Sequence, residues 1–202
     1  MSTPTITASQ VKELRDLTGA GMMDCKAALV ETGGDTEAAV ELLRVRLGDK
    51  ALKMGGREAT EGTIQSYIHG NGKVGVLVEV DCNTDFVARN DDFIAFAREI
   101  AMHIAASPTV RYVSEDEIPQ ADKDAELRVF EQQAADKPEN VRVKIAEGKL
   151  RKWMEDVVLL KQSHVNVDKH ESKTIEEMRA ALSGTTGENV VIRRFSRFAV
   201  GA

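Results

Sequence analysis

The segment Gly70-Asn-Gly-Lys-Val-Gly75 has the spacing GxGxxG, in which glycines let the backbone approach the pyrophosphate of a dinucleotide. This chemistry requires a helix after the loop, because the N-terminus of that helix faces the phosphates. Here β-branched residues alternate instead and predict a strand, at Val74, Val76, Val78 and Val80. We therefore interpret the match as accidental. Since the chain also lacks GxxxxGK[ST], we expect no guanine nucleotide bound by a phosphate-binding loop and no cofactor.

The spacing of histidines, cysteines and carboxylates predicts neither a metal centre nor covalent catalysis. The four histidines follow no HExxH or Cys/His pattern, so no zinc site is expected at His69, His103, His164 or His170. Cys25 and Cys82 lie in separate segments without a CxxC pair, which indicates reduced thiols. The carboxylates are scattered and suggest no acid–base pair. We predict that the chain is not an enzyme.

An acid and a large aromatic residue, Asp85 and Phe86, stand where a strand pattern ends and a helical pattern begins. Connections of this kind lie on the surface and often carry function. Phe86 either staples the following helix to the sheet or is offered to a partner. Composition alone favours the first interpretation, because burying a Phe stabilises a fold by roughly 1.5–3 kcal/mol.

Two further places offer side chains that suit contact with another protein. Met22 and Met23 follow Thr18-Gly-Ala-Gly21 and are either one core and one surface residue or an adaptable contact pair, since thioethers are flexible. His69 comes just before a predicted hairpin turn, Asn71-Gly72, and is either a polar residue flanking the turn or a partner contact.

Hydrophobic periodicity predicts three short helices within residues 7–48. Ser9 is the expected cap of the first helix, and the segment Thr18-Gly-Ala-Gly21 is expected to end that helix. Asp35 or Thr36 is the expected cap of the third helix. The apolar positions lie at helical spacing, at Val11, Leu14, Leu17, Met23, Ala27, Val30, Ala39, Leu42 and Leu43. We assign residues 1–50 to this helical module and residues 51–61, with Gly55-Gly56, to a linker.

The hydrophobic pattern of residues 62–202 predicts an α+β core and dimerisation domain. From Gly62 the hydrophobic period changes to two, giving a hairpin whose second strand is Val74–Val80. Helical patterns follow at residues 92–106, about 120–135, beyond Pro138 and about 174–182, and residues 190–200 predict a closing strand. The fold class is therefore α+β, with an N-terminal three-helix module followed by an antiparallel sheet covered by helices.

Composition excludes several classes of partner. The chain is 42% hydrophobic and 30% charged, and its apolar runs fall far short of the ~20 residues that span a bilayer. A net charge of −6 argues against direct nucleic-acid binding, which depends on clustered Lys and Arg. The N-terminus lacks the pattern of a signal peptide. We expect a cytoplasmic protein that binds neither membrane nor nucleic acid.

Three segments together resemble bacterial elongation factor Ts, the guanine-nucleotide exchange factor of elongation factor Tu: residues 7–15, 18–26 and 83–89. The resemblance implies that the three-helix module is similar to a ubiquitin-associated domain and grips the nucleotide-binding domain of the partner through Arg15, Met22 and Met23. It also implies that the motif Thr84-Asp-Phe-Val87 meets the partner near its magnesium site, where the aromatic ring displaces helices and loosens GDP.

The resemblance implies further contacts and an assembly. His69, in Tyr67-Ile-His-Gly70, is similar to a contact histidine of the family. The expected partner is elongation factor Tu, both GDP-bound and nucleotide-free. The chain resembles the short members, which pair with themselves, so a homodimer is expected. An alternative is a non-catalytic adaptor similar to ubiquitin-associated proteins, whose β-domain only dimerises; it leaves Phe86 without a role.

Overall fold

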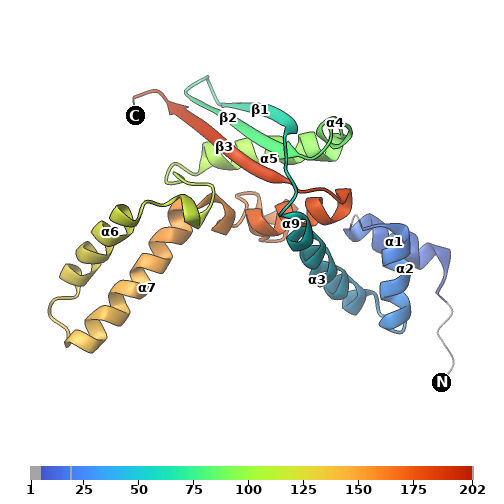
Figure 1. The fold of residues 1–202 in the computed structure, drawn as a ribbon, viewed down its shortest axis with the longest axis horizontal. Coiled ribbons are helices and arrows are strands. Elements are labelled where there is room, and N and C mark those ends of the chain that lie inside the picture. Colours follow the sequence, from blue (N-terminus) through green and yellow to red (C-terminus); the bar gives the residue numbers. More distant parts are fainter. Residues whose placement is uncertain (1–5, 19, 202) are drawn as a thin grey trace. The chain divides into compact units, whose positions relative to one another are not determined.

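The computed structural model describes residues 6–18 and 20–201, and its contacts divide the chain into two compact units. The first unit consists of residues 1–63, 80–95 and 177–191. The second consists of residues 64–79, 96–176 and 192–202. Figure 1 labels the elements that build them. Gly19, part of the segment expected to end the first helix, lies outside the described residues.

Three helices occupy the N-terminal part of the first unit, as predicted: α1 (Ala8–Thr18), α2 (Met22–Glu31) and α3 (Thr36–Met54). They share one core of buried apolar side chains, made by Val11, Leu14, Ala20, Cys25, Ala28, Leu29, Ala39, Leu43 and Leu47. Helix α3 continues through Met54, so the first residues of the expected linker 51–61 are helical.

The first helix begins with a reciprocal cap that differs from the predicted one. The backbone N–H of Gln10 donates to Thr7 Oγ1 at 3.3 Å, and the Thr7 N–H donates to Gln10 Oε1 at 3.0 Å. Thr7 therefore caps α1 in place of Ser9. Only Thr7 has a glutamine three positions further along the chain, and the side-chain amide of that Gln10 reaches back to the Thr7 N–H. The third helix is capped as expected, since Asp35 Oδ1 accepts from the N–H groups of Glu37 and Ala38.

A three-stranded antiparallel sheet has the strand order β1 (Glu61–His69), β2 (Val74–Cys82) and β3 (Val191–Ala199). The β1–β2 turn contains Gly72 at a φ of +80°, a conformation that glycine adopts without strain. On the inner face Val76, Val78 and Val80 are buried. A strand follows the GxGxxG segment, as predicted.

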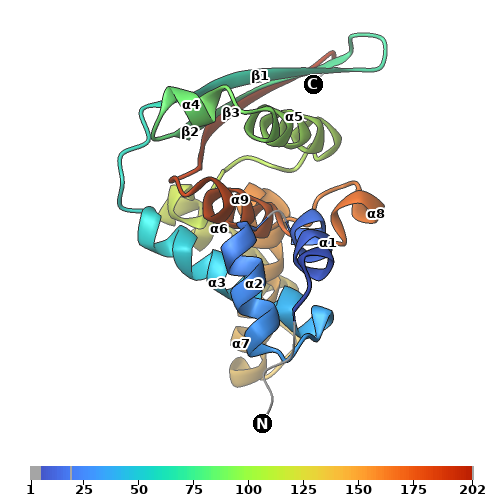
Figure 2. The same ribbon diagram turned by 90° about the vertical axis from the view of Figure 1, so that its right-hand side faces the viewer.

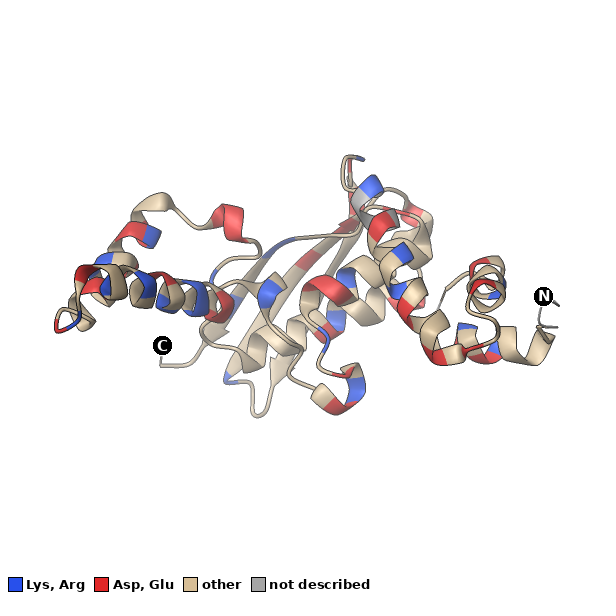
Figure 3. Ribbon diagram, turned by 90° about the horizontal axis from the view of Figure 1, so that it is seen from below, with Lys and Arg blue, Asp and Glu red and all other residues tan. Residues whose placement is uncertain are grey.

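The remaining helices confirm the predicted α+β class. Helix α5 (Asp91–Ala106) is followed by α6 (Gln120–Gln133), α7 (Glu139–Val157) and α9 (Ile175–Thr186). Two one-turn helices were not predicted, α4 (Asp85–Ala88) and α8 (Val167–His170), nor were the 3₁₀ turns Glu115–Glu117 and Leu159–Lys161. Figures 1 and 2 show α6 and α7 side by side as a hairpin, and in Figure 3 acidic and basic residues are interleaved along it.

Helix α5 covers the inner face of the sheet within the second unit. Arg98 of α5 donates to Gln65 of β1 at 3.1 Å, and Arg197 of β3 donates to the carbonyl of Ala105 at 3.2 Å. The helix turns a fully apolar stripe inward, with Phe96, Ala97, Ile100, Ala101 and Ile104 buried. Because hydrophobic burial is the main stabilising term, this stripe fixes the helix on the sheet.

Within the first unit, Gly184 of α9 lies against Leu47 of α3. A Cβ at position 184 would come within 2.7 Å of Leu47 Cδ2, so a larger side chain would have to push the two helices apart. The division into residues 1–50, 51–61 and 62–202 stays a prediction. None of the helices in the described part of the chain is long and apolar enough to cross a membrane.

Candidate functional site

The turn after β2 presents the aromatic residue that the sequence singled out. Thr84 is the N-cap of α4, and its side chain accepts from the Val87 N–H at 3.5 Å. Phe86, the second residue of this one-turn helix, is 83% exposed, whereas Phe93 on the adjoining helix α5 is fully buried. Phe86 therefore does not staple α5 to the sheet, and its ring is free to enter another molecule.

Asp85 and Val87 flank Phe86 on the same turn and are both partly exposed. Asp85 Oδ2 lies 3.2 Å from an NH2 nitrogen of Arg89, one helical turn on. An exposed ion pair of this kind contributes about 0–1 kcal/mol, so a partner can displace it at little cost. Four of the predicted contact residues, Thr84, Asp85, Phe86 and Val87, thus lie together on one short element.

The residue that holds this turn was missed by the sequence analysis. Glu188, which follows α9, accepts hydrogen bonds from the backbone of Asn83 and Thr84 and from the Thr84 hydroxyl. Its neighbour Asn189 donates its N–H to Asn83 Oδ1 at 2.8 Å. These residues are more than a hundred positions apart, and no local sequence pattern joins them.

The helical module carries its three predicted contact residues on the surface. Arg15 is exposed near the end of α1, while Met22 and Met23 open α2 with 57% and 74% of their surfaces accessible. Both methionines are exposed, so the alternative of one core and one surface residue is wrong. The core side of α2 is formed instead by Cys25, Ala28 and Leu29.

His69 belongs to the second unit, at the end of β1. Its side chain is exposed, and its Nδ1 lies 3.1 Å from the hydroxyl oxygen of Tyr67 on the same strand. Tyr67 and His69 therefore support each other at the mouth of the hairpin turn.

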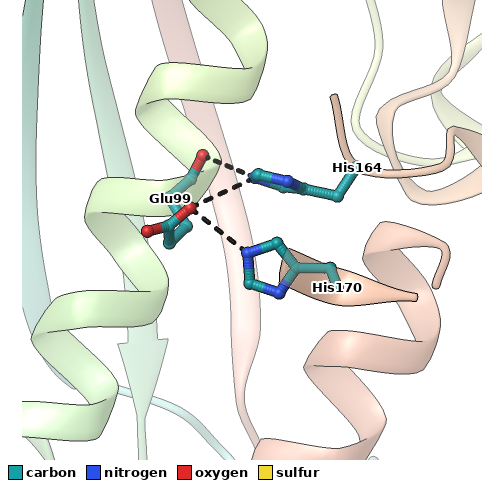
Figure 4. A group of neighbouring side chains, drawn as sticks. All are labelled: Glu99, His164 and His170. Carbon is teal, nitrogen blue, oxygen red and sulfur yellow. Dashed lines mark hydrogen bonds and ion pairs between the residues drawn. The ribbon is translucent and has the colours of Figure 1, made fainter. Parts of the chain in front are cut away.

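A cluster of histidines lies in the second unit around Glu99 of α5 (Figure 4). Among the described residues, Glu99, His164 and His170 place one possible ligand atom each within 4.8 Å of one another. His164 Nε2 lies 3.6 Å from Glu99 Oε2, and His170 Nε2 lies 3.3 Å from the same oxygen. Lys169 binds the other carboxylate oxygen.

The hydrogen bonds of this cluster favour a metal-free network. The Asn166 N–H donates to His164 Nδ1 at 3.1 Å, so the proton of neutral His164 sits on Nε2, the atom that would have to bind the metal. Metal-bound histidines instead donate from their second nitrogen. The ammonium group of Lys169 also donates a hydrogen bond to the second oxygen of the Glu99 carboxylate. The cluster therefore ties the residues after α7 to α5.

His103 is held in the same way. Its Nδ1 accepts from the Val165 N–H at 3.1 Å, and its Nε2 lies 2.9 Å from Gln162 Oε1. Burial lowers the pKa of His103 and of His164 below the ordinary value of 6.5. For Glu99, burial raises the pKa, but the hydrogen bonds of Lys169 and His170 outweigh this effect and lower it.

We expect the folded protein to lose stability as the pH falls below about 6.5, the pKa of an unfolded histidine. Between that value and the lowered pKa of the folded state, the unfolded chain binds more protons, so acidification favours unfolding. His164→Gln should flatten part of this slope. Urea unfolding between pH 7.5 and 5.5 measures the free energy, and equal slopes for both proteins would contradict the expectation. Glu99 titrates at lower pH and lies outside this window.

Comparison with known proteins places these features in a family. The sequence profile described as "Elongation factor TS" matches residues 21–173. A relative named "Elongation factor Ts" in Geobacter sulfurreducens is 48% identical over 198 residues, covering 97% of this chain and 90% of the relative. One in Syntrophobacter fumaroxidans is 47% identical and covers 98% of both, and one in Picosynechococcus is 50% identical over 97% of this chain and 89% of its own length. The chain belongs to the elongation factor Ts family.

Proposed function

We propose that this chain binds elongation factor Tu and promotes the release of its GDP during translation elongation, in the cytoplasm. The observation that carries the proposal is the exposed Phe86 on a turn held by Glu188. Exchange consists of binding and release without covalent bonds, so the chain acts as an exchange factor rather than as an enzyme. The family and the names of its relatives support this function.

The residues divide the task between two surfaces. Arg15, Met22 and Met23 of the helical module grip the nucleotide-binding domain, and Phe86 enters between helices near the magnesium site, with His69 as a further contact. A tenfold weakening of GDP binding needs about 1.4 kcal/mol. Burial of one Phe side chain supplies roughly 1.5–3 kcal/mol, which is sufficient. Asp85 contributes polar contact beside the ring.

Thermodynamic reciprocity tests the proposal. If the chain weakens the binding of GDP, then GDP must weaken the binding of the chain by the same factor. We expect a stable complex with nucleotide-free elongation factor Tu on gel filtration, which added GDP dissociates. A complex whose affinity is unchanged by GDP would contradict exchange and favour the adaptor function, in which Phe86 has no role.

We also propose that the chain forms a homodimer through the outer face of its sheet. This face, in the second unit, exposes large apolar side chains that strands usually keep from water. They are Ile64 and Ile68 of β1, Leu77 of β2, Phe198 of β3, and Val200, which follows β3. The family resemblance to members that pair with themselves supports a second copy as the occupant.

A charge placed on this face should abolish the dimer. Leu77 is half exposed, and Leu77→Lys would bury a charge against the second copy. Val129→Lys, at a similarly exposed position on α6, is the matched control. Sedimentation equilibrium at micromolar concentration should give a dimer for the wild type and control and a monomer for Leu77→Lys. A wild-type monomer of 22.1 kDa with full exchange activity would refute the homodimer.

A further inference from the structure

Phe86 lacks the packing that usually orients an aromatic ring. Its side chain is 83% exposed, so hydrophobic contacts within the chain do not set its direction. The direction of the Cα–Cβ bond then depends on the backbone of residues 83–87. Whatever fixes that backbone determines where the ring enters a partner, because a misplacement of about 1 Å in a functional group is costly.

Glu188 fixes this backbone through three hydrogen bonds from one carboxylate. Its Oε2 accepts from the N–H groups of Asn83 and Thr84, each at 3.0 Å, and its Oε1 accepts from Thr84 Oγ1 at 2.5 Å. Hydrogen bonds to an ionised acceptor are about twice as strong as neutral ones. The Thr84 hydroxyl donates to Glu188 and accepts from the Val87 N–H, so the carboxylate is linked directly to the turn that bears Phe86.

The backbone around Glu188 is itself held in place on both sides. The Ser183 hydroxyl donates to the backbone carbonyl of Glu188, and Gly187 takes a φ of +74° that reverses the chain after α9. Asn189 Nδ2 donates to the carbonyl of Arg57 at 2.9 Å, which ties the segment leaving α3 to the same residues. Glu188 thus stands in a segment that hydrogen bonds join to α9 and to the residues after α3.

Cys82 adds a third tie to Thr84. Its Sγ donates to the Thr84 carbonyl at 3.2 Å. Burial and, second, the negative charge of Glu188 raise the pKa of this thiol to about 11, so it stays protonated and keeps donating at neutral pH. Both backbone groups of Thr84 and its hydroxyl therefore have partners inside the first unit.

We infer that Glu188 is a positioning residue for nucleotide exchange, which presents Phe86 in the orientation that the partner requires. This inference rests on the proposed exchange function and adds the residue that acts through Phe86. Without the carboxylate, the turn would have to be ordered at the step in which Phe86 enters the partner, after the helical module has bound. The maximal rate of GDP release would then fall more than the affinity of the complex.

A double-mutant cycle tests this role. We expect Glu188→Ala to lower the maximal rate of GDP release from elongation factor Tu about tenfold, and to have no further effect in a Phe86→Ala background, since residues that act as a unit are not additive. Glu188→Gln keeps an acceptor for both N–H groups and should restore most of the rate. Glu61→Ala removes a carboxylate that also lies near Cys82 but accepts none of the turn's hydrogen bonds, and should leave the rate unchanged.

Amide hydrogen exchange in the isolated protein gives a second readout. The N–H groups of Asn83 and Thr84 should exchange at least about tenfold faster in Glu188→Ala, while those of the β2 core stay protected. If the alanine variant folds poorly, Glu188→Asp, one methylene too short to reach, provides the same comparison. Equal GDP release by the wild type and these variants would overturn the inference and leave the proposed function standing. A wild type that does not accelerate release would overturn both.

Discussion

Phe86→Ala should lower the maximal rate of GDP release from elongation factor Tu by at least about tenfold, the equivalent of 1.4 kcal/mol. The proposed function has this ring displace helices of the partner, so its loss should slow release, whereas the chain itself loses little packing. Because Phe86 is exposed, its removal should change the free energy of unfolding by no more than about 0.5 kcal/mol. Exchange kinetics and urea unfolding on the same preparation measure the two effects.

Phe93→Ala is the matched control, since the same substitution is made a few residues away in a fully buried ring. It should cost about 3–5 kcal/mol of stability, because it leaves a cavity in the core. The exchange rate per folded molecule should stay near that of the wild type. A Phe86 variant that melts well below wild type and exchanges normally would show that Phe86 belongs to the core.

The second large effect concerns the two exposed methionines at the start of α2. Met22→Lys combined with Met23→Lys should weaken the complex with elongation factor Tu at least about tenfold, because two charges would be desolvated in the contact. The maximal rate of GDP release at saturating concentration should change little, since Phe86 is intact. Titration of the release rate against protein concentration separates these effects.

Val45→Lys provides the control for the methionine pair. Val45 is exposed on α3 and belongs to the same three-helix bundle, so its substitution adds a charge without touching the predicted contact. It should leave the half-saturating concentration unchanged. An equal loss of affinity in both variants would indicate that a general change of charge, rather than the methionine surface, weakens the complex.

Local patterns predicted most elements of the fold. Burial on one face leaves a periodic pattern among residues that are close in the sequence. This pattern is the alternation from Val74 to Val80 in the strand and the apolar stripe from Phe93 to Ile104 in the helix. The sequence predicted the cap of α1 at Ser9 because Thr7 and Ser9 are chemically similar. The two hydrogen bonds between Thr7 and Gln10 identify Thr7 as the cap. Helices α4 and α8 were missed because one helical turn is too short to show a period.

The candidate site was predicted in part. Asp85 and Phe86 could be found because an aromatic residue on a connection is unusual. Composition favoured the burial of Phe86, the family resemblance favoured contact with a partner, and the structure shows an exposed side chain. Glu188 could not be found, since its partners Asn83 and Thr84 are brought close by the tertiary fold alone. The histidine network around Glu99 escaped for the same reason, as His164 and His170 show no spacing that links them to α5.

Stopped-flow release of fluorescent GDP from elongation factor Tu with bound magnesium tests the central claim most directly. The complex is mixed with excess unlabelled GDP and increasing amounts of the wild-type chain. The release rate should rise with concentration, reach a plateau, and respond to amounts of the chain far below those of elongation factor Tu. A rate equal to spontaneous release at every concentration would contradict the exchange function.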